Sequence, residues 1–516
     1  MMLCNGSSTS YQGYDFYFHY RRLDVLIDAI RQGTFPNYID YSNVEGYGYF
    51  TKGFYCDIIL IPFALIGLFT NTYIAYDVMI FTMTILCGIF TYHAIRVIYK
   101  SSYVALLTSI LYTFAIYRLY DVYQRAALGE TLSFTFLPLI FLGLYHIIKG
   151  DYKKWYILTV GYSLLIFTHV ISSVLMFLTL LIMLVVYYKP ILKEPKRVGY
   201  LFLAGLVTIF VTAYYIFPVI EQVTSNTFLY SGAGKAGYGK VGFDFVFWGF
   251  ISGILYPYRA IWSGVGIILT LLILLRFFIK GKQTKKLKSV DIGVIIGICF
   301  IIASSRIFPW GTFPFSLIGF IQYPWRLYEF ASCFFAVAGA YYLSLLFVKN
   351  KSRIIVFAVS VVATMVTIYI HSENYKYLYS VKALQLYEGD SDENPTFENR
   401  YHLIGGEYFP ARILAIDYIH DRGEKVEFRN KDTQISNFER NYNVTSFDAK
   451  VHSGDSLVLP LLYYKGYSVT QNGLDLPIEQ SSTGLIQIPV DKSGRVEAYY
   501  KGKYNGLAFI FQLSVS

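Results

Sequence analysis

The stretch VGYLFLAGLVTIFVTAYYIFP, residues 198–218, contains no charged side chain and directly follows Lys196 and Arg197. A helix needs about 20 predominantly apolar residues to cross the hydrocarbon core of a bilayer, and this stretch is long enough. The whole chain has the same character: of 516 residues, 55% are hydrophobic and 15% are charged, and the mean hydropathy is +0.44. Soluble domains carry about 25% charged residues. The composition therefore excludes an ordinary cytosolic enzyme or a disordered chain, and it predicts a membrane protein.

The chain contains further apolar runs of this kind. Together they predict a polytopic α-helical membrane protein with about ten transmembrane helices. Lys and Arg concentrate in short clusters between these runs, as they do in cytoplasmic loops, so both termini and the long connections are predicted to face outward. This distribution argues against nucleic acid as a partner, despite the net charge of +10. The predicted spans are residues 75–98, 102–118, 131–148, 154–171, 172–188, 198–218, 260–280, 290–304, 327–347 and 353–371.

The chain divides by pattern into three parts. Residues 1–74 are predicted to form a first external loop with an amphipathic segment and a re-entrant apolar segment at 58–69, and residues 75–371 the transmembrane helical domain. After residue 372, short alternating stretches separated by turns such as Asn472-Gly473 predict an extracytoplasmic β-sandwich-like domain, residues 372–516. Its tyrosines at 463, 464 and 467 suit either sugar stacking or packing.

The segment GYDFYFHYRRLDVLIDAIRQGTFP, residues 13–36, is the most informative part of the first loop. Asp15, His19 and Arg22 are spaced to share one helix face, with an apolar stripe beside them. The carboxylate could accept the proton of an attacking hydroxyl, and His19 and Arg22 could bind a phosphate leaving group. The alternative is an interfacial amphipathic helix whose polar face meets lipid headgroups.

Together with other motifs, this segment resembles the large bacterial integral membrane proteins of the YfhO-like type, also described as 6-pyruvoyl-tetrahydropterin synthase-related membrane proteins. The resemblance covers nearly the whole chain, in order. The motifs that carry it are Asp15-x-x-x-His19-x-x-Arg22, Gly33-Thr34-Phe35-Pro36, Gly46-Tyr47-Gly48-Tyr49, Phe54-Tyr55-x-Asp57, Arg125-Ala126-Ala127-Leu128-Gly129-Glu130, Thr168-His169, Gln322-Tyr323-Pro324-Trp325-Arg326 and Gly406-Glu407-Tyr408-Phe409-Pro410.

The membrane region of that family is similar to the C-type glycosyltransferase fold (GT-C). Enzymes of this fold use a polyprenyl-phosphate-linked sugar and carry an acidic residue in the first external loop, so the resemblance makes Asp15 the candidate catalytic base. They normally have a transmembrane helix before that loop, whereas nothing apolar precedes Asp15 in this sequence.

The remaining candidate residues each have a functional and a structural interpretation. Arg125 and Glu130 could bind a donor phosphate and a sugar hydroxyl, or could pair with each other. Gln322, Trp325 and Arg326 could bind a ligand or anchor a helix at the interface, and Glu329 could be the ion-pair partner of Arg326. Glu407 could contact the acceptor, or could be a solvated loop residue.

We therefore expect a membrane glycosyltransferase that moves a sugar from a polyprenyl-phosphate donor to a cell-envelope glycopolymer or lipid acceptor at the external face of the cell membrane. The alternatives are a non-catalytic transporter or flippase, and an accessory subunit for envelope polysaccharide assembly. No cofactor is assigned, and a requirement for a divalent metal is left open. The lipid bilayer is an expected partner. The sequence lacks P-loop, serine hydrolase and zinc-protease motifs.

Overall fold

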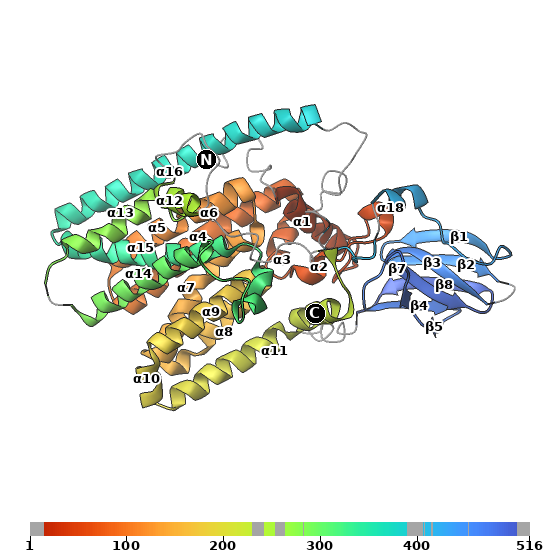
Figure 1. Cartoon of the computed structure of the whole chain (residues 1–516), viewed down its shortest axis with the longest axis horizontal. Coiled ribbons are helices and arrows are strands. Elements are labelled where there is room, and N and C mark those ends of the chain that lie inside the picture. The colour runs from red at the N-terminus through yellow and green to blue at the C-terminus, as the bar shows by residue number, and fades with distance from the viewer. Residues whose placement is uncertain are drawn as a thin grey trace. The chain divides into compact units, whose positions relative to one another are not determined.

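The structure is a computed structural model, in which a mostly helical region precedes a region of β-strands (Figure 1). By internal contacts the chain divides into two compact units. The helical unit contains the described residues within 1–19, 76–210 and 234–391, and the strand-containing unit those within 20–75, 211–233 and 392–516. The structure describes residues 15–229, 242–252, 264–281, 283–389, 406, 408–413, 416–451 and 454–502.

Within these described ranges, seven helical segments are long and apolar enough to cross a membrane, by length and composition. This is the pattern expected of a multi-pass membrane protein. Two shorter apolar segments accompany them, Val170–Val186 and Gly266–Phe278. The seven are Thr72–Tyr99, Ser102–Arg125, Leu128–Ile148, Lys196–Ser225, Lys285–Ser304, Pro324–Leu346 and Asn350–Glu373.

Figure 1 labels the α-helices along the chain. In chain order they are α1 (Phe16–Arg31), η1 (Val44–Gly46), α2 (Thr51–Phe54), α3 (Ile61–Phe69), α4 (Thr72–Tyr99), α5 (Ser102–Thr113), α6 (Ile116–Tyr120), η2 (Asp121–Arg125), α7 (Leu128–Ile148), η3 (Tyr152–Lys154), α8 (Tyr156–Thr168), α9 (Val170–Val186), α10 (Tyr188–Lys193), α11 (Lys196–Ser225), α12 (Phe243–Ile251), α13 (Gly266–Leu274), η5 (Leu275–Phe278), α14 (Lys285–Ser304), η6 (Phe315–Ile321), η7 (Pro324–Leu327), α15 (Tyr328–Leu346), α16 (Asn350–Gly389) and α18 (Ile416–Arg422).

Two helical segments extend beyond their predicted ends. The span predicted at 102–118 continues through α6 and η2 to Arg125, because the charged side chains that ended it in the sequence are buried in the helical unit. The helix predicted to end at 371 continues to Gly389, so the expected domain boundary at 372 falls inside α16. Residues 372–388 contain neither Gly nor Pro, and nothing local stops the helix before Gly389.

Helix α7 lies at the centre of the helical unit. The apolar stretch of α7 is 83% buried within the protein. That of Asn350–Glu373 is only 17% buried, so this part of α16 presents most of its surface outward. Gly143 allows α7 to approach α8 closely: a Cβ there would come within 2.4 Å of the backbone nitrogen of Leu158. Small residues at such crossings bring membrane helices close together.

The strand-containing unit has two antiparallel sheets, one ordered β1-β2-β8-β4-β5 and one ordered β3-β7-β6. The predicted Asn472-Gly473 turn is confirmed: both residues have positive φ, 51° and 81°, and Gln471 pairs with Leu474 across it. The final stretch, residues 506–516, whose pattern fits either a last strand or the beginning of a helix, lies outside the described residues. The strands are β1 (Gln434–Asn441), β2 (Val444–Lys450), β3 (Asp455–Leu462), β4 (Tyr467–Gln471), β5 (Leu474–Leu476), β6 (Glu479–Gln480), β7 (Leu485–Val490) and β8 (Gly494–Tyr500).

Alternation along the strands explains the core of this unit. In β7, Ile486, Ile488 and Val490 are buried at every second position, as a strand with one covered face requires, and Leu485 at its start is buried as well. Tyr464 and Tyr467 are also buried, which favours the packing interpretation of these two rings. Tyr463 remains partly exposed.

Candidate functional site

Charged side chains from four segments gather in the helical unit, and we call this group the carboxylate–arginine cluster. It consists of Asp15, which precedes α1, Asp121 and Arg125 of η2, Glu130 in the first turn of α7, and Arg326 of η7. The last four are at most 8% exposed. Asp, Glu and Arg are rarely this buried unless they are paired. Their pairing is therefore the first property of the cluster to establish.

Glu130 connects the two arginines. Its Oε2 accepts a hydrogen bond from Arg125 Nη1 at 2.7 Å and lies 3.3 Å from Arg326 Nε. Its Oε1 accepts a hydrogen bond from the Tyr117 hydroxyl at 2.5 Å. A single carboxylate thus holds two guanidinium groups at the N-terminal end of α7. Arg125 and Glu130 were expected either to bind a ligand or to pair with each other, and the structure shows that they form a buried ion pair.

Arg125 is also held by η2 itself. Its Nη1 donates to Asp121 Oδ1 at 2.7 Å, one turn earlier. Its backbone carbonyl accepts a hydrogen bond from the Asp15 N–H at 2.8 Å, which attaches the start of α1 to the cluster. Burial raises the pKa of Asp15 above its usual value, although the nearby charges of Arg125 and Arg326 act in the opposite direction. Asp15 therefore holds a proton more tightly than an exposed aspartate does.

The backbone is unusual on both sides of the cluster. Residues 121–125 form a π-helical turn, and Ala126 after it is left-handed, with φ 49°. Gln322, just before η7, has φ 61° and ψ −61°. Both conformations are costly for residues with a Cβ, and such turns are common where a side chain must be placed for function. Here they position Arg125 and the segment that carries Arg326.

Glu329 belongs to a second set of contacts next to the cluster. It accepts hydrogen bonds from the Ser133 and Ser172 hydroxyls, the latter at 2.9 Å, and Ser172 Oγ lies 2.8 Å from His169 Nδ1. The prediction that Glu329 pairs with Arg326 is wrong, because in the described residues the ion pair of Arg326 is with Glu130. One turn of helix brings Glu329 toward α7 and α9 instead.

The other predicted residues lie in different surroundings. His19 is buried in the helical unit. Arg22 is buried in the strand-containing unit, where its Nη2 is 3.7 Å from Asp57 Oδ1 and its guanidinium lies 4.6 Å from the centre of the Tyr55 ring. A phosphate bound by Arg22, as predicted from the sequence, would therefore compete with Asp57 for this guanidinium. Helix α1 itself and its buried apolar stripe are as predicted.

Near Arg326, the Trp325 ring stacks on Tyr323 with 4.3 Å between ring centres. Its Nε1 is buried and has no hydrogen-bond partner among the described residues. Gln322 is partly buried beside them. Glu407 lies outside the described residues. This stacked pair is compatible with both the ligand and the anchoring interpretations.

Sequence reasoning missed Asp121, Tyr117, Ser133 and Ser172. The i, i+4 spacing of Asp121 and Arg125 is a signal that could have found the first of these. The others come from different turns and helices, and no local pattern connects them with Glu130 or Glu329. Within the described part of the chain, no group of three or more His, Cys, Asp or Glu side chains is arranged to hold a metal ion.

No protein-family model matches the chain. An uncharacterized protein of Lactococcus lactis subsp. cremoris is 22% identical to it over 560 aligned residues, which cover 95% of this chain and 87% of that protein. The similarity therefore extends across both units. The resemblance to YfhO-like and GT-C proteins stays a prediction.

Proposed function

We propose that the protein transfers a sugar from a polyprenyl-phosphate donor to a cell-envelope glycopolymer or lipid acceptor at the outer face of the membrane. One observation carries this proposal: the partly buried Asp15 is tied through its backbone to Arg125, which shares the Glu130 carboxylate with Arg326. A general base and two cations next to each other are what displacement of a sugar from a phosphate needs.

In the proposed step, the acceptor hydroxyl oxygen forms a bond to the anomeric carbon of the sugar as its proton passes to the Asp15 carboxylate. The bond between that carbon and the phosphate oxygen breaks, and the phosphate leaves with the bonding electrons. Because this is a single displacement, the anomeric configuration inverts. Asp15 must be ionised to accept the proton, and its raised pKa makes it a stronger base than an exposed aspartate.

Arg125 and Arg326 would stabilise the charge that develops on the departing phosphate. Arg326 Nε is buried and lies 3.3 Å from Glu130 Oε2 without making a hydrogen bond to a described residue, so a donor phosphate would share this cation with Glu130. Arg326 Nη1 donates to the Ile321 carbonyl at 3.0 Å, which fixes the plane of the guanidinium. Glu130 and Asp121 would act as positioning residues that hold the two cations before the donor arrives.

The topology belongs to the same proposal. With about ten transmembrane helices and the basic clusters inside, the N-terminal loop and the strand-containing region both face outward. An acceptor polymer outside the cell would then reach Asp15 without crossing the membrane. The partly exposed Tyr463 is the remaining candidate of the three tyrosines for contact with that polymer.

The decisive experiment measures transfer of labelled sugar from a polyprenyl-phosphate donor to envelope polymer in membranes that contain the parent protein or Asp15→Asn. Asparagine keeps the shape of the side chain but cannot accept the proton, so turnover should fall by roughly 100-fold or more. Asp28→Asn, an exposed change on the same helix, is the control and should keep parental activity. An active parent whose Asp15→Asn variant remains fully active contradicts the assigned base. A parent without transfer activity contradicts the enzyme proposal and favours transport or an accessory role.

A further inference from the structure

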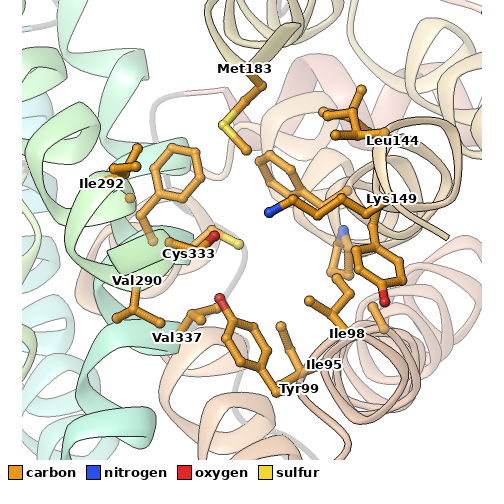
Figure 2. A pocket seen from close by; sticks show the side chains of 18 of the residues that line it. Ile95, Ile98, Tyr99, Leu144, Lys149, Met183, Val290, Ile292, Cys333 and Val337 are labelled. Carbon is orange, nitrogen blue, oxygen red and sulfur yellow. The ribbon is translucent and has the colours of Figure 1, made fainter. Parts of the chain in front are cut away.

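The helical unit contains a second feature, an apolar hollow along the C-terminal half of α7 (Figure 2). It lies between α4, α7, α9, α14 and α15 and has a volume of about 920 Å³, including space open to its surroundings. Side chains such as Ile95, Leu144, Met183, Val290 and Val337 line it. A hollow with this lining suits hydrocarbon better than a sugar or a polar metabolite.

The hollow extends from Pro138, in the middle of α7, to the end of this helix opposite Glu130. Glu130 is in the first turn of this 21-residue helix, whereas Lys149 directly follows its last turn and lines the hollow. A helix of this length measures about 30 Å, close to the thickness of the hydrocarbon core. A lipid with its headgroup at Lys149 would therefore occupy the opposite leaflet from a donor with its phosphate at Arg125.

Lysines gather where the hollow meets the helix ends. Figure 2 shows the Lys149 ammonium reaching into it, and Nζ lies 4.3 Å from the centre of the Tyr187 ring. Lys286 Nζ donates to the carbonyl of Tyr99, another lining residue, at 2.6 Å. Burial lowers the pKa of Lys149, and the charge of nearby Lys285 lowers it further. These cations repel one another, and none of the described residues that line the hollow is acidic.

We propose that the hollow binds an acyl chain of an anionic phospholipid, with the lipid phosphate at Lys149. The apolar lining would shield the acyl chain from water, and the negative phosphate would reduce the repulsion between the positively charged lysines. Basic pockets between membrane helices bind anionic headgroups for the same reason. This site is separate from the proposed donor site and does not depend on the glycosyltransferase proposal.

The test is native mass spectrometry of the full-length protein in detergent, titrated with dioleoyl phosphatidylglycerol or dioleoyl phosphatidylcholine. These lipids have the same chains and differ in headgroup charge. The parent should bind phosphatidylglycerol preferentially. Lys149→Gln should weaken that binding about fivefold, the usual effect of one lysine near an anionic headgroup, and leave phosphatidylcholine binding unchanged. Lys153→Gln, an exposed change in the same basic cluster but outside the hollow, is the control.

A second pair of variants tests the location of the acyl chain. Gly293 lines the hollow, and a Cβ there would be 3.5 Å from Phe334, an ordinary contact, so Gly293→Leu should fill the space with little strain. It should reduce phosphatidylglycerol binding at least tenfold. Gly205→Leu is the matched control, because no described atom lies within 4 Å of a Cβ at that position. Equal binding of the two lipids by the parent, or equal binding by the two leucine variants, would overturn the proposal.

Discussion

Arg326 Nε and Glu130 Oε2 lie 3.3 Å apart, and this contact joins η7 to the first turn of α7. Because Arg125 donates to the same carboxylate oxygen, the position of each guanidinium depends on Glu130. A phosphate that binds here would share both cations with Glu130 rather than meet free charges. The site is therefore organised before a ligand arrives, and its parts can be tested separately.

Replacing Arg326 with Lys should lower sugar transfer roughly 100-fold, which is the usual effect of removing one donor to a developing charge. The ammonium keeps the charge, but it cannot bond the Ile321 carbonyl and contact Glu130 in the same plane. The transfer assay in membranes measures this change. Arg353→Lys, a change at a partly exposed arginine of another helix end, should keep parental activity. Equal activity of both variants would exclude a role for the guanidinium geometry.

Replacing Glu130 with Gln should destabilise the protein by about 3 to 5 kcal/mol, because two buried arginines lose their shared partner. Equilibrium unfolding of the purified protein in mixed detergent micelles measures the change. The control is Glu194→Gln: Glu194 pairs with Arg197 at 2.9 Å but its side chain is 43% exposed, so the loss should stay below about 1 kcal/mol. A similar loss of unfolding free energy in both variants would mean that burial of the cluster does not make its ion pairs more important for stability.

Asp15→Asn should be more stable than the parent at neutral pH, although it is less active. Because the pKa of Asp15 is raised above 3.8 in the folded protein, its stabilising contribution is complete below that value and is lost as the pH rises through the folded pKa. The neutral asparagine avoids this loss. Thermal unfolding at pH 7.5 and at pH 4 should show a gain that shrinks on acidification. A variant less stable than the parent at both values would contradict burial as the main cause of the shift.

Gly473→Ala should weaken the β4–β5 hairpin by about 1 to 2 kcal/mol, the cost of a left-handed residue with a Cβ. A Cβ at this position would contact no described atom within 4 Å, so the cost is conformational only. Hydrogen exchange of the β4 and β5 amides in the full-length protein measures it. Gly473→Asn should restore most of the protection, because asparagine tolerates this conformation better than alanine. Unchanged exchange in the alanine variant would rule out this turn conformation.

The proposed topology predicts different labelling of two cysteine variants in a background without native cysteines. Glu439→Cys, whose parent side chain is 67% exposed, should react with a membrane-impermeant maleimide in intact cells. Gln283→Cys, next to a basic cluster, should react only after the membrane is permeabilised. The reverse pattern would place the strand-containing region inside the cell.

Local pattern was enough to predict the long apolar helices and the C-terminal region of strands, because apolar length and alternation reflect the burial of a single segment. It misplaced the end of the 102–118 span because hydropathy treats Arg118 and Asp121 as exposed, whereas tertiary contacts bury both. Arg118 Nη1, for example, donates to the Thr113 carbonyl at 2.9 Å.

The candidate site was predictable only in part. Asp15, Arg125, Glu130 and Arg326 were each identified, but their connections were not. Glu329 follows Arg326 by one turn, the spacing of an ion pair on a regular helix, yet Glu130 is the actual partner. The pairing of Arg326 with Glu130 depends on how η7 and α7 pack against each other. Residue spacing within a single segment carries no information about that packing.

The π-helical turn at Asp121–Arg125 gives the chain one residue more than an α-helix would use to cover the same distance. Deleting a single residue within it would allow ordinary i to i+4 bonding and remove a costly conformation. The same deletion would rotate Arg125 by about 100° relative to the helix before it, given 3.6 residues per turn. Homologues that differ by one residue here would therefore keep the helix but carry the guanidinium on another face, which makes chain length at this turn a marker for retention of the site.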